Sequence, residues 1–144
     1  MSEPFVHTLR VRYAECDAQG VVFNAHYLTY FDVSITELWR AALGSYDAMR
    51  EQGIDVVVAD AQLSFRSPAR FDDLLTLEIS IARLGNTSVT SAHRISRDGV
   101  VVIEGTITHV VVELPALTKT PIPDWLRESL APWTVEGDEP GPAQ

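Results

Sequence analysis

The hydrophobic pattern of this chain changes once from a helical period to a strand period, and that change most limits how it can fold. Between residues 28 and 43, apolar side chains recur at steps of three and four, as on one face of a helix. Residues 56–113 instead contain long runs rich in Val, Ile, Leu and Thr, which favour strands. The sequence therefore predicts an α+β fold with one long helix and an antiparallel sheet.

Turn signals divide the region that favours strands. One strand is expected before the helix, and four are expected after it, at residues 5–12, 56–65, 75–82, 87–97 and 100–113. Gly-Asn and Asp-Gly pairs separate the last three of these, so they should form an antiparallel meander. One helix covers only one face of such a sheet. The other face, or an edge, is therefore expected to meet a second copy in a homodimer or homotetramer.

A length of 144 residues fits one domain. The predicted domain covers residues 1–133, and its last element is a short helical segment at 124–131 that follows two prolines. Residues 134–144 are rich in Glu, Asp, Gly and Pro without hydrophobic periodicity. They are predicted to form a disordered acidic tail.

The charge and cysteine content exclude several classes of function. The chain carries 11 Lys and Arg against 20 Asp and Glu, a formal charge of −9, which repels nucleic acid and anionic membranes. Cys16 is the single cysteine, so neither a disulfide framework nor a Cys-rich zinc site is expected, and the scattered histidines predict no metal site. The longest apolar runs have four residues and the first residues lack the apolar core of a signal peptide. We therefore predict a cytoplasmic protein with neither a nucleic-acid nor a membrane partner.

Residues 13–32 hold the most informative chemistry. Asp17 lies in a predicted turn shortly before the helix, whose first amides Asn24 is expected to cap and whose end Gly44 is expected to mark. Unpaired amides at a helix start can hold an oxyanion, and a nearby carboxylate can attack a carbonyl or activate water. An Asp in a turn is equally explained by its local hydrogen bonds. These residues alone leave both interpretations open.

The same segment resembles the signature of hotdog-fold thioesterases of the 4-hydroxybenzoyl-CoA thioesterase type. That signature is an acid, two residues, Gly, and then a hydrophobic approach to a helix start and a Tyr. The matching residues are Asp17, Gly20, Val21, Val22, Asn24, Tyr27 and Asp32. The resemblance extends over most of the chain. It implies one hotdog domain at residues 1–133, in which a five-stranded antiparallel sheet curls around one long helix.

The resemblance also implies catalytic roles. Asp17 matches the catalytic carboxylate, which acts as nucleophile or as general base. Asn24 matches the helix-start residue whose backbone amide, with that of Ala25, forms the oxyanion hole. Some relatives carry His at this position, so an imidazole role does not transfer to Asn24.

Substrate contacts follow from the same resemblance. Tyr27 and Phe31 are expected to line the acyl pocket, and Asp32 matches an acid that reads the ring hydroxyl in the hydroxybenzoyl branch. The implied reaction is hydrolysis of an acyl-CoA to a free acid and coenzyme A, with no cofactor other than the coenzyme A of the substrate. Its phosphates require local cations. Arg66 and Arg70 flank a predicted Ser-Pro turn and are the first candidates, and Arg94 and Arg97 on the meander are further ones.

An alternative from another class is a module that binds acyl-CoA or acyl-carrier protein without turnover. Asp17 separates the two hypotheses, because a pure binder has no need of a carboxylate at the reacting carbon. The sequence does not specify the acyl group.

Overall fold

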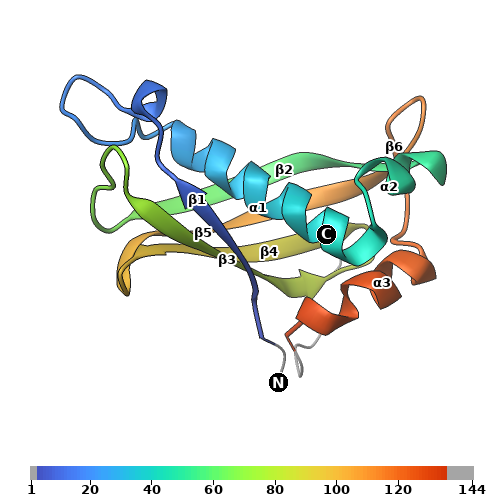
Figure 1. Cartoon of the computed structure of the whole chain (residues 1–144). Coiled ribbons are helices and arrows are strands. Elements are labelled where there is room, and N and C mark those ends of the chain that lie inside the picture. Colours follow the sequence, from blue (N-terminus) through green and yellow to red (C-terminus); the bar gives the residue numbers. More distant parts are fainter. Residues whose placement is uncertain (1–2, 136–144) are drawn as a thin grey trace.

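The computed structural model (Figure 1) describes residues 3–135, which form six strands, three α-helices and two short 3₁₀ turns. In chain order the elements are β1 (Phe5–Arg10), η1 (Tyr13–Glu15), α1 (His26–Leu43), α2 (Asp47–Glu51), β2 (Ile54–Phe65), β3 (Leu74–Leu84), β4 (Ser88–Arg97), β5 (Val100–Glu113), β6 (Thr118–Lys119), α3 (Asp124–Leu130) and η2 (Ala131–Trp133). The one long helix and the long strands expected from the sequence are all present. The short elements α2 and β6 were not predicted.

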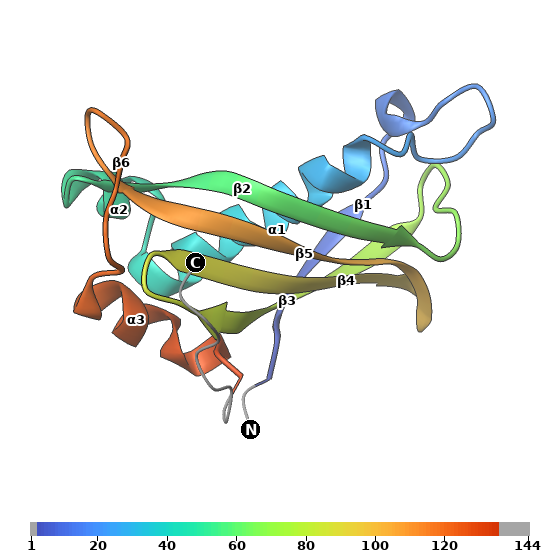
Figure 2. The same ribbon diagram turned by 180° about the vertical axis from the view of Figure 1, so that it is seen from behind.

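The sheet has the strand order β1-β3-β4-β5-β2, and the short strand β6 pairs with the end of β5. All these pairings are antiparallel, and β3, β4 and β5 form the predicted meander. Figures 1 and 2 show the sheet curled around α1, which lies against its concave face. This arrangement confirms the hotdog fold.

The core lies between α1 and the concave face of the sheet. Phe31, Ile35, Leu38 and Trp39 of the predicted helical face are all buried, together with the alternate side chains of β3. Leu28 was predicted to belong to the same buried face, but its side chain is 45% exposed. Leu28 lies outside the packed core and instead lines a cavity beside the helix.

Two glycines have conformations or surroundings that a side chain would disturb. Gly44 has a φ of +89° and ends α1, as predicted, because its left-handed backbone stops the helical hydrogen bonds. Gly105 in β5 faces α1, and a Cβ there would lie 2.9 Å from the Phe31 ring and 2.3 Å from the Gln62 carbonyl oxygen. The absence of a side chain at position 105 therefore lets Phe31 pack directly on the sheet.

The unpredicted helix α2 is tied to β2 by a buried carboxylate. Asp55 is 7% exposed and accepts hydrogen bonds from the Tyr46 hydroxyl at 2.5 Å and from Arg50 Nη1 at 3.0 Å. Burial, followed by the hydrogen bond to Asp55, raises the pKa of Tyr46 to about 12, so the hydroxyl keeps the proton that it donates. This cluster stabilises the end of the domain that lies far along α1 from the helix start.

The end of the described chain packs on β3. Thr134 forms an isolated parallel bridge with Ile81, and the Val135 amide donates to the Ile81 carbonyl at 3.0 Å. These two residues belong to the predicted tail of residues 134–144. Residues 136–144 lie outside the described part, so a disordered tail stays a prediction.

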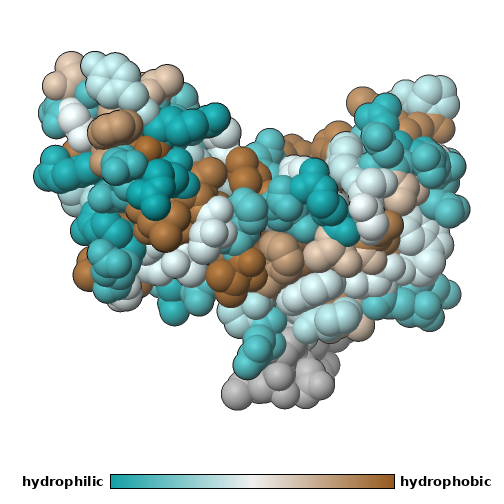
Figure 3. Space-filling model, viewed as in Figure 1, coloured by the Kyte–Doolittle hydropathy of each residue, from teal (hydrophilic) through white to brown (hydrophobic). Residues whose placement is uncertain are grey.

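The sheet ends at β1 on one side and at β2 on the other, and the longer of these two edge strands is β2. Strand β2 pairs with β5 on one side only, and its exposed side chains include Val57, Val58 and Phe65. Figure 3 shows a notch in the upper outline of the molecule, with hydrophobic surface along its floor.

Among residues 3–135, no helix combines the length and apolar character needed to cross a membrane.

Candidate active site

The segment between η1 and α1 forms a hairpin that projects beyond the start of α1 (Figure 1), and its hydrogen bonds place Asp17 near the tip. The two arms are joined by hydrogen bonds from the Asp17 amide to the Val21 carbonyl, 2.8 Å, and from the Phe23 amide to the Glu15 carbonyl, 2.9 Å. At the tip, the Asp17 carboxylate accepts the Gln19 amide at 2.8 Å, and Gly20 supplies a φ of +81°. The predicted turn is confirmed, and Asp17 within it is half-buried.

The start of α1 presents two backbone amides that remain available. The His26 amide donates to the Phe23 carbonyl at 2.9 Å, and the Tyr27 amide to the Asn24 carbonyl at 3.4 Å. Within residues 3–135, the amides of Asn24 and Ala25 donate no hydrogen bond. Unpaired donors at a helix start attract negative charge, so these two amides can accept a developing oxyanion.

The predicted capping role of the Asn24 side chain is wrong. The helix begins at His26, its N-cap is Ala25, and no side chain caps it. Ala25 has a helical backbone conformation, whereas a capping side chain normally belongs to an extended N-cap residue. Consequently, only the backbone of Asn24 belongs to the candidate oxyanion hole.

A cavity of about 340 Å³ lies between the first half of α1 and the strands β2 and β5. Its wall is mainly apolar and contains one carboxylate, with Ala25, Leu28, Thr29, Phe31, Asp32, Ile35, Val58 and Ile107 lining it. Its size and lining are those of a small-molecule site. The cavity brings together Phe31 and Asp32, both predicted to contact substrate, with Ala25 of the candidate oxyanion hole.

Tyr27, predicted to line the acyl pocket, does not line this cavity. Its side chain is buried, its hydroxyl accepts the Ala69 amide at 3.3 Å, and its ring packs edge-on against Tyr30 and Phe65. Burial raises the pKa of Tyr27, and the hydrogen bond with the Ala69 amide opposes this shift without cancelling it. The contacts of the Tyr27 side chain therefore join α1 to β2 and to the loop after it.

Two histidines are buried on the concave face of the sheet near the cavity. The His93 ring stacks on Phe31 at 4.4 Å between ring centroids, and its Nε2 lies 2.8 Å from the Ser91 hydroxyl. Burial, followed by the proximity of His109, lowers the pKa of His93 to about 3. Burial also lowers the pKa of His109, although Asp32 opposes that shift. Both rings are therefore neutral near pH 7.

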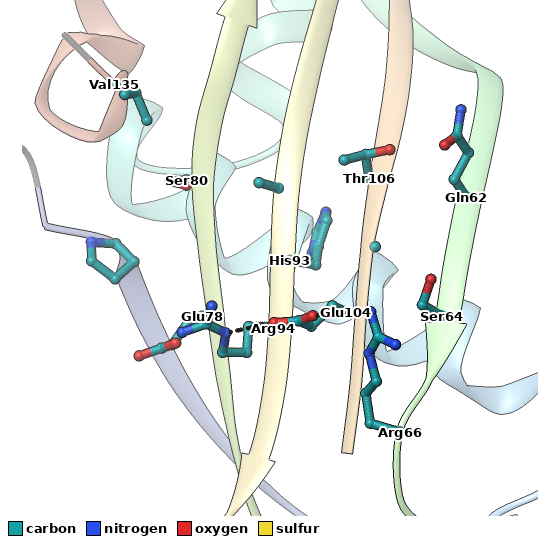
Figure 4. Close-up of a pocket in the computed structure, with 13 residues that line it drawn as sticks. Gln62, Ser64, Arg66, Glu78, Ser80, His93, Arg94, Glu104, Thr106 and Val135 are labelled. Carbon is teal, nitrogen blue, oxygen red and sulfur yellow. Dashed lines mark hydrogen bonds and ion pairs between the residues drawn. The ribbon is translucent and has the colours of Figure 1, made fainter. Parts of the chain in front are cut away.

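The predicted phosphate-binding residue Arg66 lies by a second hollow, on the convex face of the sheet and away from α1. Figure 4 shows side chains from four strands converging there, with Arg66 and Arg94 on either side of Glu104. Glu104 lies 3.6 Å from Arg66 Nη2 and 3.1 Å from Arg94 Nε. The hollow of about 560 Å³ is lined largely by small polar and charged side chains. Arg66 is thus engaged in an ion pair away from the acyl cavity.

Arg70, the other predicted phosphate-binding residue, lies beside the hairpin. It forms an isolated bridge with Val21, whose carbonyl accepts the Asp17 amide. The side chain of Arg70 is in an exposed position, and no ion pair is found for it in the described part of the chain. The structure therefore places Arg70, rather than Arg66, next to the candidate catalytic loop.

Sequence reasoning missed residues that complete the site. Leu28 was assigned to the core, and Val58 and Ile107 were assigned only to strands, although all three line the cavity. Glu15 and Tyr30, which support the hairpin, were not singled out. The sequence signal that could have identified Glu15 is that it is a second carboxylate only two positions before Asp17.

In the described part of the chain, no group of three His, Cys, Asp or Glu residues could hold a metal ion.

Comparison with known proteins identifies the class to which this fold and site belong. The sequence pattern of the thioesterase superfamily matches residues 19–104. The chain belongs to this superfamily, and it is a thioester hydrolase.

Individual relatives agree with this assignment. The acyl-CoA thioester hydrolase YbgC of Escherichia coli is 32% identical over 87 residues, which cover 60% of this chain and 65% of that protein. The acyl-CoA thioesterase YbgC of Haemophilus influenzae is 27% identical over 120 residues, covering 83% and 88%. A crystal structure of an Aquifex aeolicus protein superimposes with a TM-score of 0.83 at 27% identity, covering 88% of this chain and 99% of the other.

Proposed function

We propose that the protein hydrolyses an acyl-CoA thioester, with Asp17 as nucleophile or general base and the amides of Asn24 and Ala25 as the oxyanion hole. The pair of unpaired amides at the start of α1 is the observation that carries this proposal. Ala25 also lines the acyl cavity, so an acyl group lying in the cavity would direct its carbonyl to that helix start. Two relatives named acyl-CoA thioesterases support the choice of carrier.

The proposed reaction requires both stabilisation and attack. As the thioester carbonyl becomes tetrahedral, its oxygen gains negative charge that the two amides accept without reorganising. Asp17 either attacks the carbonyl carbon to form an anhydride, which water then opens, or removes a proton from water as water attacks. In both routes the C–S bond breaks and coenzyme A leaves as the thiolate, which takes up a proton that the consumed water supplies.

We also propose that the working enzyme is a homodimer joined along β2. In the described chain the outer edge of β2 is unpaired over a 12-residue strand, and an exposed strand edge of this length favours pairing with another strand. Val58 on this strand also lines the cavity. Asp17 does not line the cavity of its own chain, so a second copy at this edge would complete the walls of the site.

A panel of aryl, short-chain and long-chain acyl-CoA thioesters tests the proposed function. Catalytic release of free thiol from at least one member is the expected result. Saturable binding of a thioester without thiol release would instead support the binding module.

Single-turnover hydrolysis in heavy-oxygen water addresses the two roles of Asp17. Label in the Asp17 carboxylate would show that an anhydride forms and that water attacks its aspartyl carbonyl. Label confined to the acid product is consistent with a general base and with attack at the acyl carbonyl of an anhydride. Trapping of an acylated Asp17 by rapid acid quenching then separates these two routes.

A further inference from the structure

Glu15 is a buried carboxylate two residues before Asp17 that the proposed reaction does not use. It is 7% exposed and lies at the base of the hairpin. Its Oε1 accepts the Arg12 amide at 2.8 Å and the Tyr30 hydroxyl at 2.9 Å, and its Oε2 accepts Arg12 Nη2 at 2.8 Å. Buried carboxylates are costly unless such partners surround them.

The charge of Glu15 is retained at neutral pH. Burial raises the pKa of Glu15, but hydrogen bonds from Arg12 and Tyr30 outweigh burial and leave the pKa below its ordinary value. Burial and the same contact raise the pKa of Tyr30. The phenol therefore stays a donor and the carboxylate stays an acceptor, which makes this a charge-assisted contact.

Glu15 connects the parts of the chain that the proposed chemistry must hold together. Its side chain binds Arg12 and reaches Tyr30 in the second turn of α1, while its carbonyl accepts the amide of Phe23 at 2.9 Å. Phe23 directly precedes Asn24, the first residue of the candidate oxyanion hole. Glu15 thus contacts the residue before the hairpin, the hairpin itself and α1.

We propose that Glu15 is a positioning residue, whose buried carboxylate fixes the Asp17 hairpin against α1 so that Asp17 and the helix-start amides act on the same carbonyl. This inference rests on the proposed function. It requires that loss of the carboxylate lower turnover through Asp17, because a displacement of about 1 Å at a reacting group can cost about 10²-fold in rate.

The chain contains a matched control. Asp55 is also 7% exposed, and it also accepts hydrogen bonds from a Tyr hydroxyl and an Arg guanidinium, those of Tyr46 and Arg50. Asp55 joins α2 to β2, and neither it nor its two partners line the acyl cavity. Loss of Asp55 should therefore cost stability without moving the hairpin.

The experiment compares Glu15→Gln with Asp55→Asn in the full chain, using the acyl-CoA that the wild type hydrolyses fastest. In each variant an NH2 group replaces one carboxylate oxygen and faces the Tyr or Arg group that donated to that oxygen. Both variants should therefore lose thermal stability. For folded enzyme, we expect Glu15→Gln to lower kcat about 100-fold with KM changed less than threefold. Asp55→Asn should keep kcat within twofold. Equal effects on kcat in the two variants would overturn the inference.

A double variant tests whether Glu15 acts through Asp17. Adding Glu15→Gln to Asp17→Asn should lower the residual turnover by less than threefold, because Asp17 is already lost. A further loss as large as in the wild-type background would show that Glu15 acts independently and would overturn the inference. Unimpaired turnover by Asp17→Asn would instead refute the proposed function itself.

Tyr30→Phe tests the same positioning role if the Glu15→Gln variant does not fold. This change keeps the carboxylate and removes only the hydrogen bond from α1. We expect it to lower kcat about tenfold with little change in KM, whereas Tyr46→Phe should leave kcat unchanged. Equal kcat in Tyr30→Phe and wild type would contradict the positioning role.

Discussion

Acid should destabilise this protein through His93 at pH values where most carboxylates are still ionised. The ring is buried against Phe31, and its Nδ1 has no hydrogen-bond partner in the described chain. Its pKa is lowered from 6.5 to about 3, mainly by burial. Between these two values the unfolded chain binds a proton that the folded chain does not, so the free energy of unfolding must fall as the pH decreases.

The size of the effect follows from the two pKa values. Each pH unit below the unfolded-state pKa of 6.5 lowers stability by about 1.4 kcal/mol until the folded-state value near 3 is reached. At pH 5 the expected loss is about 2 kcal/mol relative to pH 8. His109 contributes in the same direction, because its pKa is also lowered by burial.

A comparison with His93→Phe isolates this contribution. Urea denaturation of both proteins at pH 8 and pH 5 gives four free energies of unfolding. The wild type should lose about 2 kcal/mol more than the variant over this interval. A loss of equal size in both proteins would refute the reasoning, because it would show that the pKa of His93 is the same in the folded and unfolded chains.

Two other predictions concern packing and assembly. Gly105→Ala should lower the free energy of unfolding by about 3 kcal/mol, measured by urea denaturation, because the new methyl group meets the Gln62 carbonyl and the Phe31 ring. An unchanged free energy would mean that α1 does not pack directly on β5. Val57→Asp should convert the proposed dimer to monomers, because a two-fold pairing of β2 edges would bring two carboxylates close together. Sedimentation velocity measures this change, and a dimer that persists in the variant would place the interface elsewhere.

The sequence predicted the parts of the fold that depend on local pattern. The α1 face and the meander follow from periodicity, and Gly44 and the Asp98-Gly99 pair follow from positive φ values that their turns require. The cap by Asn24 failed because the helix begins after a tight turn in which Ala25 is already helical. Side-chain preferences do not specify that backbone path.

The candidate site was harder to predict, because tertiary contacts build it. Asp17 and Asp32 came from a local motif, whereas the support that Glu15 receives from Tyr30 spans 15 positions and depends on how the hairpin folds onto α1. Likewise, Arg66 and Arg70 are close in sequence, yet one lies by the convex face and the other beside the hairpin. Sequence distance did not reveal this separation.

Replacement of Asp17 by Asn tests the central claim most directly. Turnover of the best acyl-CoA is measured together with the affinity of its non-hydrolysable thioether analogue. We expect kcat to fall at least 100-fold while the affinity for the analogue changes less than threefold. Wild-type turnover in Asp17→Asn would contradict the assignment of this carboxylate to the chemistry of thioester hydrolysis.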